Sequence, residues 1–116
     1  MKNAYPKYHN QKTEIDGITF DSKLEANRYS ELKILEKGGI ISGLQLQPEF
    51  ELIPPFTKNG KKYRGMNYVA DFTYYDNQEK RVVIEDAKGC ETDVYKLKKK
   101  MFEYMYPTLT ITEIKR

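Results

Sequence analysis

The sequence predicts an α/β domain in which a mixed central β-sheet is flanked by two helices. Two stretches begin at a capping residue and end at glycine or proline, which is typical of helices. Runs of alternating or β-branched residues lie between and after them, which favours strands. The predicted order is helix, strand, strand, strand, helix, strand. We expect one domain over residues 1–116, with residues 1–13 as a flexible N-terminal arm.

The composition limits the chemistry that the chain can carry. Its one cysteine, Cys90, and its one histidine, His9, exclude an intrachain disulfide and a zinc site built from Cys and His. Both are interpreted as incidental, and any metal must be held mainly by carboxylates. No apolar run approaches the roughly 18 residues of a membrane span, and the N-terminus lacks a signal-peptide core. We therefore expect a cytoplasmic protein that does not bind a membrane.

Positive charge is unevenly distributed along the chain. Lys and Arg number 20 against 17 Asp and Glu, a net charge of +3. Residues 13–54 carry four bases and eight acids, whereas residues 55–64 carry four bases and no acid. Ten Tyr and five Phe add surfaces on which nucleic-acid bases can stack. This mixture indicates nucleic-acid binding, but a solvated surface on a Tyr-rich domain has the same composition.

The N-terminal third predicts a hairpin followed by a helix. Residues 13–20 alternate in polarity and contain an Asp-Gly pair, which favours a small hairpin. Asp21 or Ser22 can cap the helix that follows. The helix is expected to end at about Lys37, because two glycines come directly after it.

The middle of the chain predicts a strand and then a basic loop. Residues 44–53 alternate without a break, and Pro48 among them favours an edge strand or a bulge. Residues 54–65 are expected to form a mobile loop, because they contain two prolines, an Asn-Gly pair and a further glycine. The bases of this loop are predicted to contact nucleic-acid phosphates. They are Lys58, Lys61, Lys62 and Arg64.

Two further strands are predicted over residues 67–75 and 80–88. The short connection at residues 76–79 makes them an antiparallel hairpin. Thr92 can then cap a helix that reaches about Tyr106, and a β-rich segment ends the chain. Three lysines of this helix are placed to follow a phosphate backbone, although a solvated helix face explains each of them equally well. They are Lys96, Lys99 and Lys100.

Two acids in the predicted hairpin are poor choices for structure alone. Asp71 lies in the middle of an aromatic and aliphatic strand, where Asp is disfavoured. Asp86 and Lys88 share a strand face with β-branched residues. With the turn at residues 76–79, position 71 faces 84, so Asp86 lies diagonally from Asp71 at roughly 7 to 8 Å. Two such carboxylates with a lysine suit Mg²⁺ and a phosphate, whereas the structural alternative is an exposed cross-strand ion pair.

Glu25 is the third candidate acid. On a helical projection it falls inside the apolar arc of the first helix, where a carboxylate is costly unless it is used. Residues 22–25 also read as a capping box, in which the glutamate returns to the amide of the capping residue. The sequence leaves both roles open.

A helical Glu, an Asp in one strand, an Asp-x-Lys at the end of its partner and a basic helix together resemble the PD-(D/E)XK nuclease superfamily. The matching residues are Glu25, Asp71, Asp86 and Lys88. The chain looks most like the small phage-encoded endonucleases of that superfamily, often described as Holliday-junction-resolvase-like, over about residues 14–106. The segments that carry this closer likeness are residues 20–26, 47–52, 68–72 and 85–89.

The resemblance implies a restriction-endonuclease-like core and a metal-dependent reaction. Glu25, Asp71 and Asp86 would hold Mg²⁺ or Mn²⁺, and Lys88 would assist the attacking water. Ala70 stands where the family usually has proline before the first strand acid. Glu85 adjoins Asp86, so strand parity decides which of the two is the ligand.

Gln45 or Gln47 is a further candidate to line the site, as glutamine does in some relatives. The predicted function is a Mg²⁺-dependent endonuclease that hydrolyses DNA phosphodiester bonds, with branched or structured DNA as one substrate option. A homodimer is a further option. Two alternatives stay open, a catalytically silent nucleic-acid-binding module and a phage accessory protein on a decayed nuclease fold. The four intact charged residues favour an active enzyme.

Overall fold

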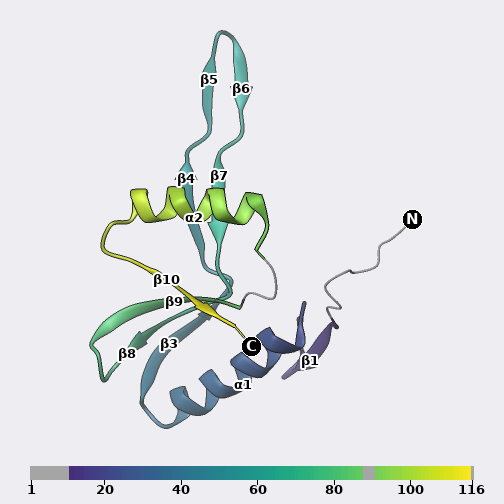
Figure 1. Ribbon diagram of the computed structural model, residues 1–116, viewed down its shortest axis with the longest axis vertical. Helices are drawn as coiled ribbons and strands as arrows, with labels where there is room; N and C mark the ends of the chain where they lie inside the picture. Colours follow the sequence, from purple (N-terminus) through teal and green to yellow (C-terminus); the bar gives the residue numbers. More distant parts are fainter. Residues whose placement is uncertain (1–10, 88–90, 116) are drawn as a thin grey trace.

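The computed structural model describes residues 11–87 and 91–115. It has an α/β architecture with a mixed sheet and two helices, as the sequence predicts (Figure 1). The elements, in chain order, are β1 (Thr13–Ile15), β2 (Ile18–Phe20), α1 (Lys23–Lys37), β3 (Ile41–Leu46), β4 (Glu49–Ile53), β5 (Phe56–Lys58), β6 (Lys61–Tyr63), β7 (Met66–Val69), β8 (Phe72–Asp76), β9 (Arg81–Ala87), α2 (Asp93–Met105) and β10 (Ile111–Ile114).

The four-stranded sheet has the order β10-β9-β8-β3. β10 runs parallel to β9, whereas β8 is antiparallel to both β9 and β3. The pairs β1-β2, β4-β7 and β5-β6 form two-stranded antiparallel sheets. The predicted hairpin at residues 13–20 is therefore confirmed.

Both helices begin and end where the sequence predicts. Ser22 is the N-cap of α1, and its hydroxyl accepts a 3.1 Å hydrogen bond from the amide of Glu25. This assigns the cap to Ser22 rather than to Asp21. Thr92 caps α2 in the same way, accepting from the amide of Tyr95 at 3.1 Å. Local capping chemistry thus fixes the ends of both helices.

Two strands that the sequence predicts as continuous are each interrupted at one junction. The break in the first strand falls at Gln47, whose φ of 52° is left-handed, directly before Pro48. The break in its partner falls between β7 and β8. The Gln47 amide donates to the Asp71 carbonyl at 2.9 Å, and the Ala70 amide donates to the Pro48 carbonyl at 3.1 Å. One long hairpin therefore bends here and passes from the four-stranded sheet into β4-β7.

The prediction of a loop at residues 54–65 is wrong, because this segment contains the hairpin β5-β6. Asn59 and Gly60 form its turn with φ values of 53° and 75°. An Asn-Gly pair with both residues in the left-handed region favours a tight hairpin turn whose twist matches the strands. The hairpin projects away from the rest of the molecule, beyond β4 and β7 (Figure 1).

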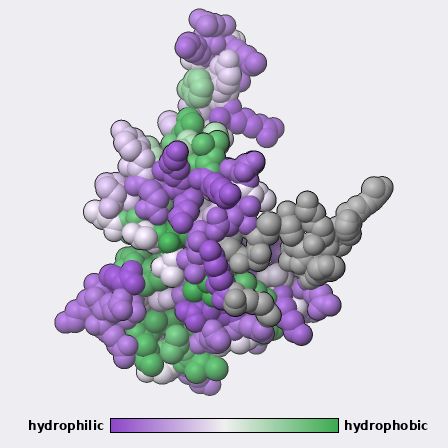
Figure 2. All heavy atoms as spheres, viewed as in Figure 1, coloured by the Kyte–Doolittle hydropathy of each residue, from purple (hydrophilic) through white to green (hydrophobic). Residues whose placement is uncertain are grey.

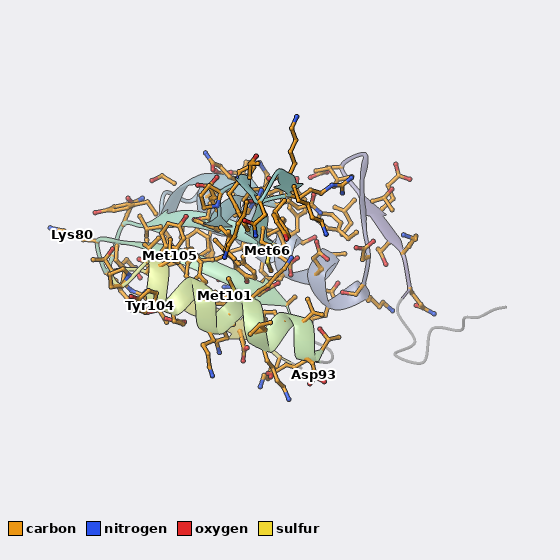
Figure 3. The ribbon with its side chains drawn as sticks, turned by 90° about the horizontal axis from the view of Figure 1, so that it is seen from above. Met66, Lys80, Asp93, Met101, Tyr104 and Met105 are labelled. Atoms are coloured by element: carbon orange, nitrogen blue, oxygen red, sulfur yellow. The ribbon has the colours of Figure 1, made fainter. Side chains whose placement is uncertain are left out.

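The core has two clusters, one for each helix. The first packs α1 against β3, β8 and β9, and the second packs α2 against β4, β7, β9 and β10. Met66 of β7 and Met101 of α2 lie at the edge of the second cluster (Figure 3). Neither helix is long and apolar enough to cross a membrane. The buried side chains at the two centres are Phe20, Ala26, Tyr29, Leu32, Ile41, Phe72, Tyr74 and Val83 in the first, and Leu52, Tyr68, Ala70, Ile84, Tyr95, Phe102 and Ile111 in the second.

Candidate functional site

The candidate site lies at the bend of the long hairpin, where β8 meets the end of β9. Phe72 pairs with Glu85, so the register places Asp71 opposite Asp86. The Asp71 amide donates to the Glu85 carbonyl at 3.1 Å. The sequence prediction, which paired position 71 with 84, is therefore wrong by two residues. In the observed register the two acids are directly opposite each other, and therefore closer together than in the predicted diagonal arrangement.

The turn between β8 and β9 explains this difference. Asp76 pairs with Arg81, so the turn occupies residues 77–80 rather than 76–79. The Asp76 carboxylate accepts hydrogen bonds from the amides of Gln78 and Glu79, at 2.9 and 3.0 Å. An Asp side chain that bonds to the next amides stabilises a turn that starts after it. Asp76 therefore stays in β8, and the register moves.

Asp71 and Asp86 form a carboxyl pair in which Asp86 is buried and Asp71 is half-buried. Asp86 is only 3% exposed, and the Asp71 carboxyl lies within hydrogen-bonding reach of it. The Ala87 amide donates to the second oxygen of Asp71 at 2.7 Å. Burial, and after it the negative charge of Asp86 and a hydrogen bond with it, raise the pKa of Asp71 to about 8, although the Ala87 amide acts in the opposite direction. When two carboxyl groups lie within hydrogen-bonding reach of each other, ionisation of both is unfavourable unless a cation binds between them.

Tyr68 fixes the position of Asp86. The Tyr68 hydroxyl donates a hydrogen bond to Asp86 Oδ2, and both side chains are buried. Burial and this bond raise the pKa of Tyr68 far above its usual value, so the phenol keeps its proton. The sequence pattern predicts no role for Tyr68, because its contact with Asp86 joins strands from two different sheets. The only sequence signal for this contact is a tyrosine in an apolar strand close to Asp71, because a buried tyrosine hydroxyl usually needs a hydrogen-bond partner.

Glu85 faces the opposite side of β9 and has a structural partner. Arg28 of α1 binds it with two hydrogen bonds, Nε to Oε1 at 2.8 Å and Nη2 to Oε2 at 2.6 Å. The Tyr74 hydroxyl also donates to Oε2. Strand parity therefore separates the neighbours: Glu85 joins the sheet to α1, and Asp86 joins Asp71. The position of Arg28 inside the apolar arc of the helix was the sequence signal for this ion pair.

Glu25 lies in the first turn of α1 and is buried. Its amide donates to the capping hydroxyl of Ser22, and its side chain is only 8% exposed. Its negative charge contributes to raising the pKa of Asp71, after the larger effects of burial and Asp86. The Glu25 carboxylate therefore acts electrostatically on Asp71, while the Ser22 hydroxyl caps α1.

Other predicted site residues differ in how the structure places them. Lys88 lies outside the described residues, as do Cys90 and His9. Gln47 adjoins the acids through its backbone bond to Asp71, whereas Gln45 pairs with Thr73 farther along β8. Within the ranges 11–87 and 91–115, no three Asp, Glu, His or Cys side chains form a group suited to hold one metal ion.

The predicted basic residues lie on and beside the hairpin β5-β6 and on α2. Those of the middle segment are exposed on and beside β5-β6. On α2, Lys96 and Lys100 are exposed, whereas Lys99 forms an ion pair with Glu113 at 3.2 Å. A partnered lysine is less available to a phosphate. The four exposed bases of the middle segment are Lys58, Lys61, Lys62 and Arg64.

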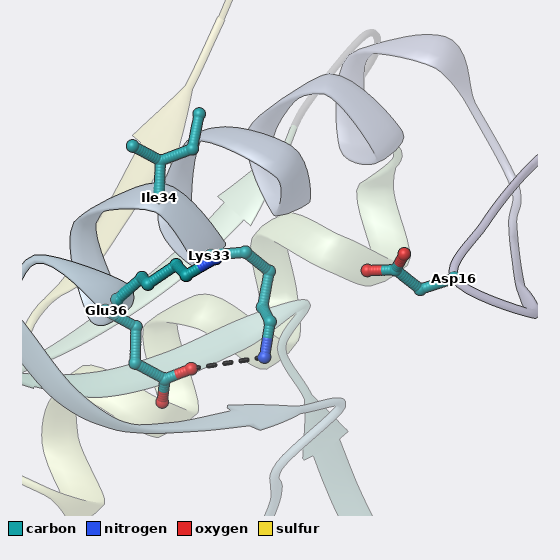
Figure 4. Close-up of a pocket in the computed structure, with 5 residues that line it drawn as sticks. Asp16, Lys33, Ile34 and Glu36 are labelled. Carbon is teal, nitrogen blue, oxygen red and sulfur yellow. Dashed lines mark hydrogen bonds and ion pairs between the residues drawn. The ribbon is translucent and has the colours of Figure 1, made fainter.

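A separate pocket lies beside the C-terminal half of α1 (Figure 4). Lys33 and Glu36 in it form an ion pair at 3.3 Å, so their charges offset each other. Ile34 and Asp16 are also part of its lining. It shares no residue with the carboxyl pair, and we assign it no chemistry.

Comparison with known proteins identifies the family. Residues 5–116 match the family described as "Protein of unknown function (DUF1064)". Because the match covers nearly the whole chain, the protein belongs to this family. No curated protein matches the chain, and no solved structure matches it.

Proposed function

We propose that the protein is a metal-dependent endodeoxyribonuclease built on a core like that of the PD-(D/E)XK nucleases. The single observation that carries this proposal is the carboxyl pair at the bend of the long hairpin, in which half-buried Asp71 lies beside buried Asp86. Two adjacent acids largely removed from water are costly as structural residues. They are useful where a divalent cation and a phosphate have to be held.

The donor set fits a hard cation. Mg²⁺ is commonly bound in proteins by one or two carboxylates together with substrate phosphates, so a dedicated group of three protein acids is not required. Asp71 and Asp86 would hold the ion, with Glu25 nearby. When bound, Mg²⁺ polarises the phosphodiester and lowers the pKa of a coordinated water. Mn²⁺ has the same preference for oxygen ligands.

The chain's own residues hold the pair in place. The Ala87 amide fixes one oxygen of Asp71, and the Tyr68 hydroxyl fixes Oδ2 of Asp86. On the other side of β9, the bond between Arg28 and Glu85 ties the strand to α1. Lys88 follows Asp86 by two positions in the sequence, and we propose that it orients the attacking water.

A nucleic-acid-binding module without catalytic activity is the second candidate. The observation that favours it is the exposed basic hairpin β5-β6, which could bind DNA whether or not the acids act. Binding and cleavage therefore have to be measured separately.

The proposal is tested on a panel of labelled duplex, nicked, four-way-branched and single-stranded DNA, incubated with Mg²⁺ or with EDTA. We expect Mg²⁺-dependent cleavage of at least one DNA and none with EDTA. Binding of DNA without cleavage in Mg²⁺ or Mn²⁺ would favour the second candidate.

A further inference from the structure

The hairpin β5-β6 carries an exposed aromatic pair. Phe56 and Tyr63 face each other across its two strands. Their rings are stacked, with centroids 4.7 Å apart and planes 9° from parallel. Phe56 is 44% exposed and Tyr63 is 41% exposed, and the hairpin projects from the body of the molecule (Figure 2). The pair therefore presents flat apolar surface to solvent rather than to the core.

A cross-strand aromatic pair also has a structural use. It stabilises a hairpin, and an isolated two-stranded hairpin needs such help. Aliphatic side chains can supply part of the same packing. What they cannot supply is a flat π surface, so the ring character of the pair is the feature that points to a ligand.

The charges around the pair indicate what kind of ligand it is. Residues 55–64 carry four bases and no acid, so the hairpin is complementary to a polyanion. The Lys61 ammonium lies 5.2 Å from the centre of the Tyr63 ring. Flat rings among cations combine base stacking with phosphate contact, which is how proteins bind unpaired nucleotides. Duplex phosphates alone would require the cations but not the rings.

The root of the hairpin holds it in a defined direction. A Cβ atom added to Gly65 would lie 2.7 Å from the Ile53 carbonyl oxygen and 3.0 Å from Cδ of Pro55. The two strands therefore approach so closely here that only glycine fits. The root is joined to the carboxyl pair by the short strand β7 (Met66–Val69). A nucleotide held on the hairpin would thus lie on the same extension of the fold as the acids.

We propose that β5-β6 is a binding element for unpaired nucleotides, in which a base stacks on the pair Phe56 and Tyr63 while the neighbouring Lys and Arg side chains contact the flanking phosphates. This inference deepens the proposed function, because nucleotide binding on β5-β6 would direct the proposed nuclease to DNA with single-stranded segments. Only this role in substrate choice rests on the proposed function. The binding itself requires neither Asp71 nor a metal.

The test compares DNA binding with EDTA present, so that no cleavage occurs. Fluorescence anisotropy is measured with a labelled single strand and with a blunt duplex of the same sequence. The variant Phe56→Leu/Tyr63→Leu keeps apolar packing between the strands but removes both rings. We expect its affinity for the single strand to fall by about 10-fold or more, and its affinity for the duplex by no more than about 2-fold.

A charge variant is the matched control. Lys61→Gln/Lys62→Gln keeps both rings and should weaken both DNAs, with the salt slope on single strands falling by roughly 0.7 for each lost phosphate contact. The leucine variant should leave that slope unchanged. Equal losses on single strand and duplex in the leucine variant, or no loss on either, would overturn the proposal.

A tryptophan variant provides a second test, which remains valid if the hairpin does not form in the leucine variant. The chain contains no Trp, so Tyr63→Trp introduces a single tryptophan, whose emission is distinct from that of tyrosine, and keeps a ring at the site. Base stacking should quench its emission when the single strand binds, and the blunt duplex should quench it far less. Equal quenching by both DNAs, or none by either, would contradict base stacking. Loss of single-strand binding in the leucine variant without any metal-dependent cleavage in wild type would refute the nuclease alone.

Discussion

The Tyr68 hydroxyl donates a hydrogen bond to Oδ2 of Asp86, and this bond joins β7 to β9 across the junction between two sheets. Both side chains are buried. Asp71, the other member of the carboxyl pair, sits at the same junction and is held by the Ala87 amide. The bend of the long hairpin therefore brings the Tyr68 hydroxyl of one sheet into contact with the Asp86 carboxylate of the other.

Replacement of Tyr68 by Phe should lower both stability and metal-dependent activity. The change removes one buried hydrogen bond to a carboxyl group and should cost about 1 to 2 kcal/mol of unfolding free energy. It also frees Asp86 to move, so cleavage at limiting Mg²⁺ should fall by about 10-fold or more and recover in part at high Mg²⁺. Urea unfolding and a Mg²⁺ titration of the cleavage rate measure the two effects. Tyr74→Phe is the control, because its hydroxyl binds Glu85: it should lose stability but keep the wild-type Mg²⁺ dependence.

The metal-free protein should lose stability as pH rises. The pKa of Asp71 is about 8 in the native state, against 3.8 for an ordinary aspartate. The native state therefore keeps a proton that the unfolded chain releases, so unfolding free energy decreases between about pH 4 and pH 8. Asp71→Asn removes this dependence and should be the more stable protein at pH 8, by on the order of a few kcal/mol. Urea titrations of both proteins in EDTA measure this. A wild type whose stability rose with pH over that range relative to the variant would disprove the assignment.

The buried ion pair between Arg28 and Glu85 should contribute more to stability than an exposed ion pair does. Arg28→Leu leaves a Glu85 side chain that is only 1% exposed without its guanidinium, and should cost about 3 kcal/mol. Arg81→Leu is the matched control, since its partner Glu79 is exposed and the pair contributes no more than about 1 kcal/mol. Chemical denaturation of the two variants measures the difference. Equal losses would mean that the buried pair contributes no more than a surface pair.

Glu25 can be assigned by a change that keeps capping intact. Glu25→Gln should leave the unfolding free energy within about 1 kcal/mol of wild type, because Ser22 supplies the hydroxyl that caps α1. If the carboxylate serves the acids, the same variant should lose most of its cleavage activity. Ser22→Ala is the comparison, with a stability loss of about 1 kcal/mol and activity retained. Thermal melting and cleavage assays together decide, and full activity in Glu25→Gln would return the residue to a structural role.

The sequence predicted what local chemistry decides. Helix boundaries follow from Ser22 and Thr92, whose hydroxyls satisfy amides three residues on, and the Asp-Gly turn follows from backbone preference. Pro48 indicated an edge strand or a bulge, but the complete break of the strand at Gln47 was not predicted, because residues 44–53 alternate across it without interruption. A left-handed residue before proline leaves no mark in the hydropathy pattern. The Asn-Gly pair in residues 54–65 was visible, but together with the two prolines and the further glycine it was interpreted as a sign of a loop rather than of a hairpin turn.

The candidate site shows the same division. Asp71 and Asp86 were recognisable because acids are rare on buried strand faces, and parity correctly put Glu85 on the other face. Their exact pairing depended on the turn, where the Asp76 side chain moved the register by two residues. Tyr68 could not be assigned, since its contact exists only after two sheets meet.

The proposal that Asp86 holds the catalytic metal is tested most directly by the single-turnover cleavage rate of Asp86→Asn. The rate of Asp93→Asn is measured beside it, and DNA binding is measured in parallel. Asp93 is an exposed acid in the first turn of α2, so its loss removes the same charge without touching the carboxyl pair (Figure 3). We predict that Asp86→Asn loses Mg²⁺-dependent cleavage by more than about 100-fold while binding DNA at least as tightly as wild type, and that Asp93→Asn cleaves normally. Cleavage by Asp86→Asn at the wild-type rate would contradict the assignment of the carboxyl pair as the metal site of a nuclease.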